Sequence, residues 1–152
     1  MSGLTNAYLD DLSKHLIGKS FLGVFPADGL SSMPKKKMFC LIFNTDLMKN
    51  PGKHFVSIFV SQKKTYYFDS FGNPNIQKHI ASFIKKTKRP CVMHCEVIQD
   101  KTSNFCGFYA LAFLLWMKKR KRSGGFYNLF RTKQHLISND SSVTKFILKE
   151  IK

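Results

Sequence analysis

Residues 38–69 contain three short apolar runs, each rich in Phe, Ile, Val and Tyr and each separated from the next by a polar turn. Runs of this length and composition are typical of β-strands. We therefore expect strands at 38–45, 54–61 and 65–69, with turns at 50–52 and 62–64. A fourth strand is expected at 91–98, whereas the glycines and prolines in residues 21–34 indicate a loop.

Elsewhere in the chain, apolar residues recur every three or four positions, as they do on one face of a helix. Amphipathic helices are expected to begin at Thr5 or Asn6, at Asn73, and at Ser141 or Ser142. The segment 106–119 is apolar nearly all round, which predicts a buried helix. This order of elements predicts an α+β fold in which a central mixed, largely antiparallel sheet packs against the buried central helix.

Length and composition narrow the class of protein. A chain of 152 residues, 43% hydrophobic and without a repeat or low-complexity tract, is expected to form a single domain over residues 1–152. The N-terminus lacks the pattern of a signal peptide, which favours a reducing compartment. The four cysteines are therefore expected to be free thiols rather than disulfides. The apolar stretch 105–117 is shorter than the roughly 20 residues that cross a bilayer, so we expect no membrane partner.

The charge of the chain is strongly basic and unevenly distributed. The net charge is +16, yet residues 1–33 hold two lysines against three aspartates, so the positive excess lies after residue 33. Such a field attracts polyanions, and nucleic acid in particular, which leaves open a non-enzymatic, basic DNA-binding protein. The basic residues also cluster locally, at Lys85, Lys86, Lys88 and Arg89, and at Lys118, Lys119, Arg120, Lys121 and Arg122.

Cys106 is a candidate nucleophile because it begins the buried helix and is followed by Gly107. At a helix start, the positive end of the dipole and unpaired backbone N–H groups stabilise a thiolate, which is the nucleophilic form. A small, inert, buried thiol is the plain alternative. Zinc binding is not expected at Cys91, His94 and Cys95, because these three residues lack a second pair of ligands.

Three further residues have the types that acyl transfer needs, and each lies at the end of an expected strand: His54, Asp69 and Gln99. A histidine can serve as the base, and an aspartate can fix its tautomer and orientation. An amide N–H₂, together with the backbone N–H of Cys106, can stabilise an oxyanion. Taken singly, His54 also fits a surface histidine, and Asp69 fits a turn-forming residue.

In combination, these residues resemble those of the adenovirus-type maturation proteases (adenain), whose clan also contains the ubiquitin-like-protein proteases. Residues 52–55 match Gly-x-His-Trp, with Phe55 in place of Trp, and residues 67–72 are similar to Phe-Glu/Asp-Pro-Phe-Gly, with Asp69 and Ser70 as the variants. Residues 99–107 match Gln-x₃-Ser-x₂-Cys-Gly, and segments 21–25 and 40–45 also resemble the family. The resemblance makes His54 the general base and acid, Asp69 its orienter, Cys106 the nucleophile and Gln99 the oxyanion donor.

The resemblance implies a viral cysteine endopeptidase that cleaves virion precursor proteins during maturation, as a monomer, in the virion and the host cell nucleus. No cofactor is expected for the chemistry itself. Adenain-type enzymes are stimulated by viral DNA and by a short basic peptide that can be disulfide-linked, and Cys91 falls where the peptide-linking cysteine would be. At the position that orients the histidine, ubiquitin-like-protein proteases use Asp, as this chain does with Asp69. An isopeptidase that removes ubiquitin-like tags is therefore the alternative.

Overall fold

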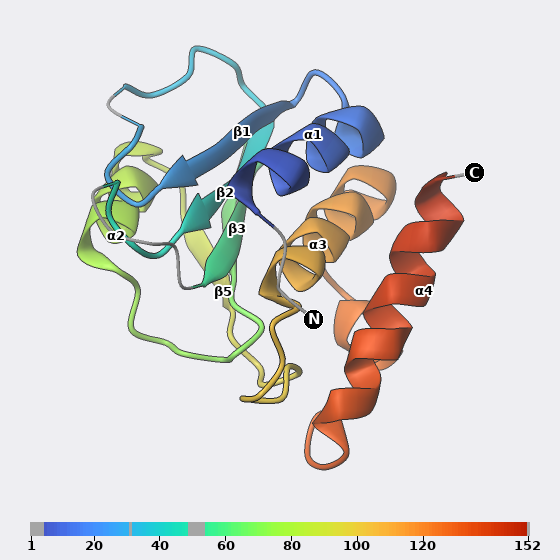
Figure 1. Ribbon diagram of the computed structural model, residues 1–152. Helices are drawn as coiled ribbons and strands as arrows, with labels where there is room; N and C mark the ends of the chain where they lie inside the picture. The colour runs from blue at the N-terminus through green and yellow to red at the C-terminus, as the bar shows by residue number, and fades with distance from the viewer. Residues whose placement is uncertain (1–4, 31, 49–53, 152) are drawn as a thin grey trace.

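The computed structural model of the chain describes residues 5–30, 32–48 and 54–151. Its centre is a five-stranded sheet in the order β1-β2-β3-β4-β5, which has helices on both faces (Figure 1). The strands are β1 (Phe21–Pro26), β2 (Phe39–Asn44), β3 (Phe55–Val60), β4 (Thr65–Phe68) and β5 (Cys91–His94). The helices are α1 (Asn6–Ile17), α2 (Lys78–Lys86), α3 (Cys106–Arg120) and α4 (Asn139–Ile151), with short 3₁₀ turns η1 (Phe126–Leu129) and η2 (Leu136–Ser138).

The sheet is mixed, as predicted. Its two central pairings, β2 with β3 and β3 with β4, are antiparallel. The two outer pairings, β1 with β2 and β4 with β5, are parallel. The predicted α+β class is therefore confirmed, with the antiparallel pairing confined to the centre of the sheet.

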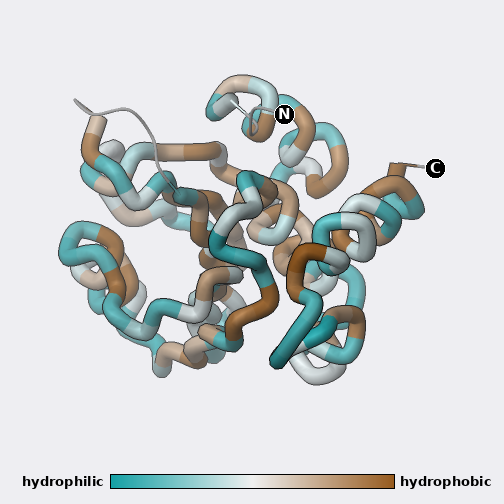
Figure 2. The backbone as a smooth tube through the Cα atoms, turned by 60° about the horizontal axis from the view of Figure 1, so that its bottom comes forward, coloured by the Kyte–Doolittle hydropathy of each residue, from teal (hydrophilic) through white to brown (hydrophobic). Residues whose placement is uncertain are grey.

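The alternation of side chains along β3 divides the core into two layers. Phe55 and Phe59 pack with α1, α3 and α4 on one face of the sheet, while Val56, Ile58 and Val60 pack with α2 on the other. Figure 2 shows the backbone of the helices passing repeatedly between hydrophobic and hydrophilic residues as it winds. A strand that is buried on both faces explains why β3 reads as a nearly continuous apolar run.

Helix α3 is the central helix that the sequence predicts. Every residue from Cys106 to Met117 except Phe108 is buried, and the helix lies on the sheet between α1 and α4 (Figure 1). Its last turn carries Lys118, Lys119 and Arg120, which complement the negative end of the helix dipole. Packing on all sides fixes the direction of α3, and so fixes where its first residue lies.

The loop expected over residues 21–34 is wrong for its first part, because residues 21–26 form strand β1. β1 is an edge strand, where a proline removes no needed ladder hydrogen bond, and Pro26 is its last residue. Gly23 has a positive φ of 147° and lies where the register with β2 shifts between Phe21 and Val24. The glycine and proline that indicated a loop thus mark a bulge and a strand end.

Several other boundaries also differ from expectation. α2 begins at Lys78 rather than at Asn73, because the side chain of Gln77 accepts hydrogen bonds from the first helical N–H groups. β5 ends at His94 rather than at residue 98, and the last helix begins at Asn139. Thr5 is the residue that caps α1. The turn expected at 50–52 lies outside the described residues. No helix among the described residues is both long and apolar enough to cross a bilayer.

Candidate active site

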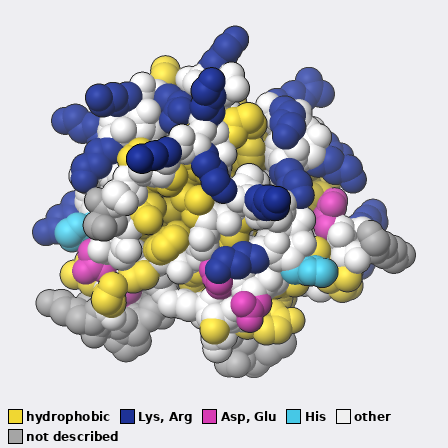
Figure 3. Space-filling model, turned by 90° about the horizontal axis from the view of Figure 1, so that it is seen from above, with side chains coloured by type: hydrophobic (Ala, Val, Ile, Leu, Met, Phe, Trp, Pro, Cys, Tyr) yellow, Lys and Arg dark blue, Asp and Glu magenta, His cyan; other side chains and the backbone are white. Residues whose placement is uncertain are grey.

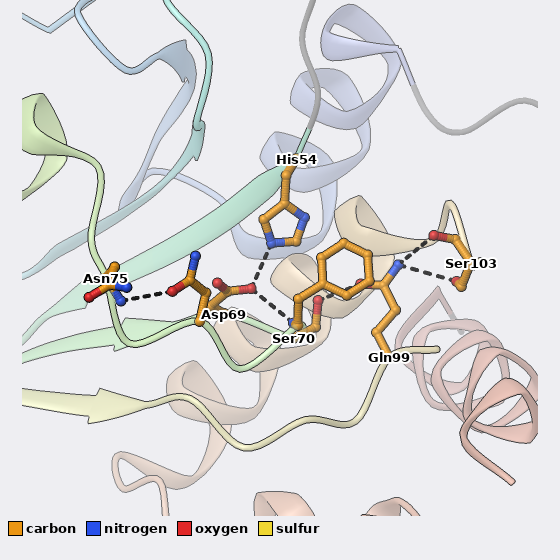
Figure 4. Close-up of polar contacts among 8 residues, drawn as sticks. His54, Asp69, Ser70, Asn75, Gln99 and Ser103 are labelled. Carbon is orange, nitrogen blue, oxygen red and sulfur yellow. Dashed lines mark hydrogen bonds and ion pairs between the residues drawn. The ribbon is translucent and has the colours of Figure 1, made fainter. Parts of the chain in front are cut away.

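His54 and Asp69 meet at one end of the sheet. His54 directly precedes β3 and Asp69 directly follows β4, and the antiparallel register of these strands brings both residues to the same end. Nε2 of His54 lies 2.6 Å from Oδ1 of Asp69 (Figure 4). Asp69 is only 3% exposed, and its Oδ1 also accepts a hydrogen bond from the backbone N–H of Phe71, at 2.9 Å. The carboxylate is therefore held in place from two sides.

The surroundings of His54 favour its charged form. Burial alone would lower the pKa of the ring, but the interactions of the ring with Asp69 and with the side chain of Cys106 outweigh burial and raise the pKa of His54 to about 9. The second ring nitrogen, Nδ1, is buried and has no hydrogen-bond partner among the described residues. With a pKa of about 9, His54 carries its proton at neutral pH, beside the side chains of Asp69 and Cys106.

Cys106 is the first residue of α3 and is 8% exposed. The preceding residue, Phe105, provides no side-chain cap for the helix. The positive end of the dipole and the N–H groups of the first turn therefore remain available to an anion at Cys106. The side chain of Cys106 also interacts with the His54 ring, since it contributes to the raised pKa of His54.

The turn that follows Asp69 completes the surroundings of His54. The backbone N–H of Gly72 donates to the carbonyl of Asp69 at 3.1 Å, so the turn-forming role considered for Asp69 coexists with its contact to His54. The ring of Phe71 lies against the ring of His54, with centroids 4.6 Å apart and planes tilted by 31°. Phe71 thereby restricts the imidazole on one face.

Gln99 is 1% exposed and its amide is held at both ends. Its Oε1 accepts from the Ser70 hydroxyl at 2.6 Å, and its Nε2 donates to the carbonyl and the Oγ of Ser103, at 3.1 and 3.2 Å (Figure 4). Since a carbonyl can only accept, the amide nitrogen must face Ser103. Ser103 is in the loop that leads directly into Cys106, so the amide donors lie on the side from which α3 begins.

A pocket of about 530 Å³ opens beside these residues. It is lined by Phe71, Val97, Gln99, Asp100, Lys101 and Leu136. Since Phe71 touches the His54 ring and Gln99 contributes the amide, the pocket adjoins the candidate site directly. Its largely apolar lining offers space for a side chain of a bound peptide.

Comparison with known proteins gives a structural likeness without a sequence match. No protein-family model matches the chain, and no curated protein matches it by sequence. The chain is similar to a solved structure of the ASFV pS273R protease, with a TM-score of 0.56 and 19% identity over 96% of this chain and 66% of that one. It is also similar to AvrA delL154, solved with IP6 and CoA, with a TM-score of 0.51 and 16% identity over 81% of this chain and 50% of that one.

At identities this low, the likeness concerns the fold. The chain has the α+β fold of cysteine-protease-fold enzymes, the class that the sequence predicts. It spans slightly under two thirds of the length of the ASFV protease and half the length of AvrA.

The other three cysteines do not share the environment of Cys106. Burial raises the pKa of Cys40 to about 12 and that of Cys95 to about 11, and it also raises the pKa of Cys91. Cys91 is exposed and begins β5, whose parallel pairing with β4 places it at the end of the sheet opposite Asp69. Among the described residues, no group of three or more His, Cys, Asp or Glu side chains is placed to hold a metal ion.

Both basic clusters also lie at the end of the sheet opposite His54. Lys85, Lys86, Lys88 and Arg89 lead into the start of β5. The second cluster, residues 118–122, ends α3, and a helix of 15 residues rises about 22 Å from its first residue. Figure 3, the view from above Figure 1, shows Lys and Arg side chains gathered over this face.

Sequence reasoning missed Ser70 and Phe71 as parts of the site. Their position directly after Asp69 was a signal that could have drawn attention to them. Asp140 was also missed, although its carboxylate accepts a hydrogen bond from Ser103 at 2.9 Å. No sequence pattern links Asp140 to a residue 37 positions earlier in the chain.

Proposed function

We propose that the protein is a cysteine endopeptidase that cleaves viral precursor proteins during particle maturation. The observation that carries the proposal is the coupled set of Cys106, His54 and Asp69, with a 2.6 Å contact between His54 and Asp69, on a cysteine-protease fold. The motifs that resemble adenain support the choice of a precursor protein as substrate. Each of the three residues then has one role in acyl transfer.

In this mechanism, the Cys106 thiolate attacks the scissile carbonyl carbon and the carbonyl oxygen becomes negative. Nε2 of Gln99 and the backbone N–H of Cys106 donate to that oxygen. His54 passes its Nδ1 proton to the leaving amine as the C–N bond breaks, which leaves a thioester on Cys106. His54 then takes a proton from a water molecule as its oxygen attacks the thioester carbonyl carbon, and collapse of that intermediate breaks the C–S bond, releases the carboxylic acid product and restores the Cys106 thiolate beside protonated His54.

The proposal is tested by replacing the nucleophile. Purified wild-type protein, Cys106→Ala and the matched control Cys95→Ala are each incubated with DNA and a proteome-derived peptide library, and new peptide termini are identified by mass spectrometry. Wild type and Cys95→Ala should cleave, and Cys106→Ala should not. Cleavage that persists in Cys106→Ala would remove the assignment.

Acyl transfer from a thioester is a second candidate, and the likeness to AvrA solved with CoA favours it. The same thiolate would attack acetyl-CoA, release the CoA thiolate and hold an acetyl group on Cys106 for transfer to a hydroxyl or amine. Incubation with labelled acetyl-CoA separates the two candidates, because an endopeptidase releases peptides and retains no acetyl label. The isopeptidase alternative would instead show as rapid release of the dye from a ubiquitin-fused fluorogenic substrate.

We also propose that the basic end of the molecule binds DNA. The side chains of Lys85, Lys86 and Lys88 are exposed there, as are those of residues 118–122. Within the second cluster, Lys119 pairs with Glu150 at 3.6 Å. A basic cluster whose positive charges outnumber its acidic partners binds phosphates by counterion release.

A peptide cofactor linked to Cys91 remains a proposal. In its favour, the thiol is exposed and β5 is an edge strand whose outer side could pair with an added strand. Mass spectrometry of purified virions tests it. A Cys91-linked peptide is expected, whereas full activity of the chain alone, together with an unmodified Cys91, would remove this idea.

A further inference from the structure

The first two residues of α4 are bonded to the segment that carries Gln99. Asn139, which is 1% exposed, donates from Nδ2 to the carbonyl of Ile98 at 2.7 Å. Oδ1 of Asp140 accepts from the hydroxyls of Ser103 and Tyr109, at 2.9 and 2.7 Å. The start of α4 therefore braces both sides of the loop that runs from Gln99 to Cys106.

The hydrogen bonds in this region form a chain with one direction. The Ser70 hydroxyl donates to Gln99, and the Gln99 amide donates to Ser103 (Figure 4). The Ser103 hydroxyl in turn donates to Asp140. A chain in which every member donates toward a carboxylate is cooperative, because each bond polarises the next.

Asp140, the last acceptor in this series of hydrogen bonds, determines whether the Ser103 hydroxyl donates to the Gln99 amide or accepts from it. A serine hydroxyl has one proton, and Asp140 accepts it, so the Ser103 oxygen must act as an acceptor. It accepts from the Gln99 amide and from the backbone N–H of Phe105, at 3.2 and 3.1 Å. Without Asp140, the hydroxyl could turn its proton toward the Gln99 amide, and the amide nitrogen would then be held by the Ser103 carbonyl alone.

We propose that Asp140 is a positioning residue: it keeps the Ser103 hydroxyl an acceptor, so that the amide nitrogen of Gln99 is held by two acceptors beside the start of α3, where the oxyanion forms. This inference rests on the proposed endopeptidase function. Ser103 holds the amide while no substrate is bound, and the negative oxyanion then competes for one of its two hydrogens. An amide nitrogen held by one acceptor alone would be less well placed to donate to that oxyanion.

The kinetic test compares Asp140→Ala with Asp140→Asn, which keeps an acceptor oxygen, and with Ser141→Ala, an exposed control on the same helix. For Asp140→Ala we expect kcat to fall about 10- to 100-fold, less than the loss on removing an oxyanion donor outright, with little change in KM. Asp140→Asn should lose less, and Ser141→Ala should match wild type. Alkylation of Cys106 by iodoacetamide should be unchanged in all three variants, because that displacement forms no oxyanion.

Two outcomes would overturn the proposal: an unchanged kcat in Asp140→Ala, or a parallel fall in kcat and in the alkylation rate, which indicates general damage to the site. A second readout needs no substrate. The side-chain amide protons of Gln99, observed by ¹⁵N NMR, should exchange with solvent faster in Asp140→Ala than in wild type, and equal exchange would refute the positioning role. If the wild type shows no Cys106-dependent cleavage, the proposed function fails, and the NMR result alone decides the role of Asp140.

Discussion

At the scale of single residues, the charge state of His54 depends on its two neighbours. Burial lowers its pKa, and the interactions with Asp69 and Cys106 raise it to about 9. Replacing Cys106 with Ala removes one of the two raising influences and leaves burial in place. We therefore predict a lower His54 pKa in Cys106→Ala, measured by NMR titration of the ring protons. A pKa that stays near 9 in this variant would mean that the thiolate is not coupled to the ring.

The raised pKa also predicts a dependence of activity and stability on pH. A group that is protonated more readily in the folded state stabilises that state fully below its unfolded pKa of about 6.5. This contribution is lost as the pH rises toward the folded value of about 9. Over the same range the proton needed by the leaving amine is also lost. Proteolysis should therefore decline through pH 9, whereas a rate that keeps rising above pH 9 would exclude an imidazolium acid.

Gln99 gives a second prediction at this scale. Gln99→Ala should lower kcat by about 10²–10³ with little effect on KM, because the lost hydrogen bond strengthens only in the transition state. Steady-state kinetics on a cleaved peptide measure both constants. A rise in KM at constant kcat would instead assign Gln99 to substrate binding.

The sequence was informative about these residues to different degrees. His54 and Asp69 could be found because they flank apolar runs, and strand ends gather at the rim of a sheet. Gln99 was expected at the end of a strand over 91–98, but β5 ends at His94 and Gln99 lies in the segment that follows it. Asp140 could not be found in this way, since its bonds reach Ser103 and Tyr109, which lie 37 and 31 residues earlier in the chain. Contacts of that range depend on how α4 packs against α3, which no local pattern encodes.

At the scale of elements, the turn between β4 and the Gln99 segment depends on Gly72. Its φ is +73°, and a Cβ there would lie 2.6 Å from Cγ2 of Val97 and 2.9 Å from the carbonyl of Cys95. Gly72→Ala should therefore destabilise the protein by about 1–3 kcal/mol and reduce activity, because the strain falls on the turn that holds Asp69.

Gly124 provides a matched control for this prediction, because a Cβ there would meet no atom within 4 Å. Denaturant unfolding of Gly72→Ala and Gly124→Ala gives the comparison. Equal stabilities of the two variants would show that the turn tolerates a side chain.

The elements that could be predicted are those whose patterning agrees with their burial. β2, β3 and β4 are apolar runs between polar turns, and α3 is apolar all round because it is buried all round. β1 was missed because its Gly23 and Pro26 are turn-forming residues elsewhere, and only the pairing of β1 with β2 shows that they mark a bulge and a strand end.

At the scale of the whole molecule, positive charge is concentrated at the end opposite the candidate site. We predict that the double variant Lys121→Glu/Arg122→Glu weakens DNA binding and makes its affinity less dependent on salt, with a slope smaller by about one unit for each phosphate that is no longer neutralised. Fluorescence anisotropy at several salt concentrations measures both quantities. Alkylation of Cys106 should not change, because the cluster lies at the far end of α3.

Lys133→Glu, on the exposed segment that precedes α4 at the end near the site, serves as the control for net charge. It should weaken DNA binding much less than the double variant. Equal losses of affinity per unit of charge in both variants would mean that DNA responds to the net charge of the molecule and not to a defined face.

The class of fold could be predicted because the order of elements constrains it, whereas strand order and direction could not. The two parallel outer pairings join strands that are separated by loops or by α2, and hydrophobic runs alone do not say which edge such a strand occupies. The convergence of His54, Asp69 and Cys106 depends on that topology.

The reactivity of the four cysteines toward iodoacetamide at neutral pH tests the central claim most directly. Peptide-level mass spectrometry gives the alkylation rate of each thiol in wild type and in His54→Ala. If Cys106 is the activated nucleophile, it is modified first although Cys91 is the more exposed thiol, and His54→Ala slows Cys106 while leaving Cys91 unchanged. If Cys91 reacts first and Cys106 stays unmodified in wild type, the chain does not use Cys106 as a nucleophile.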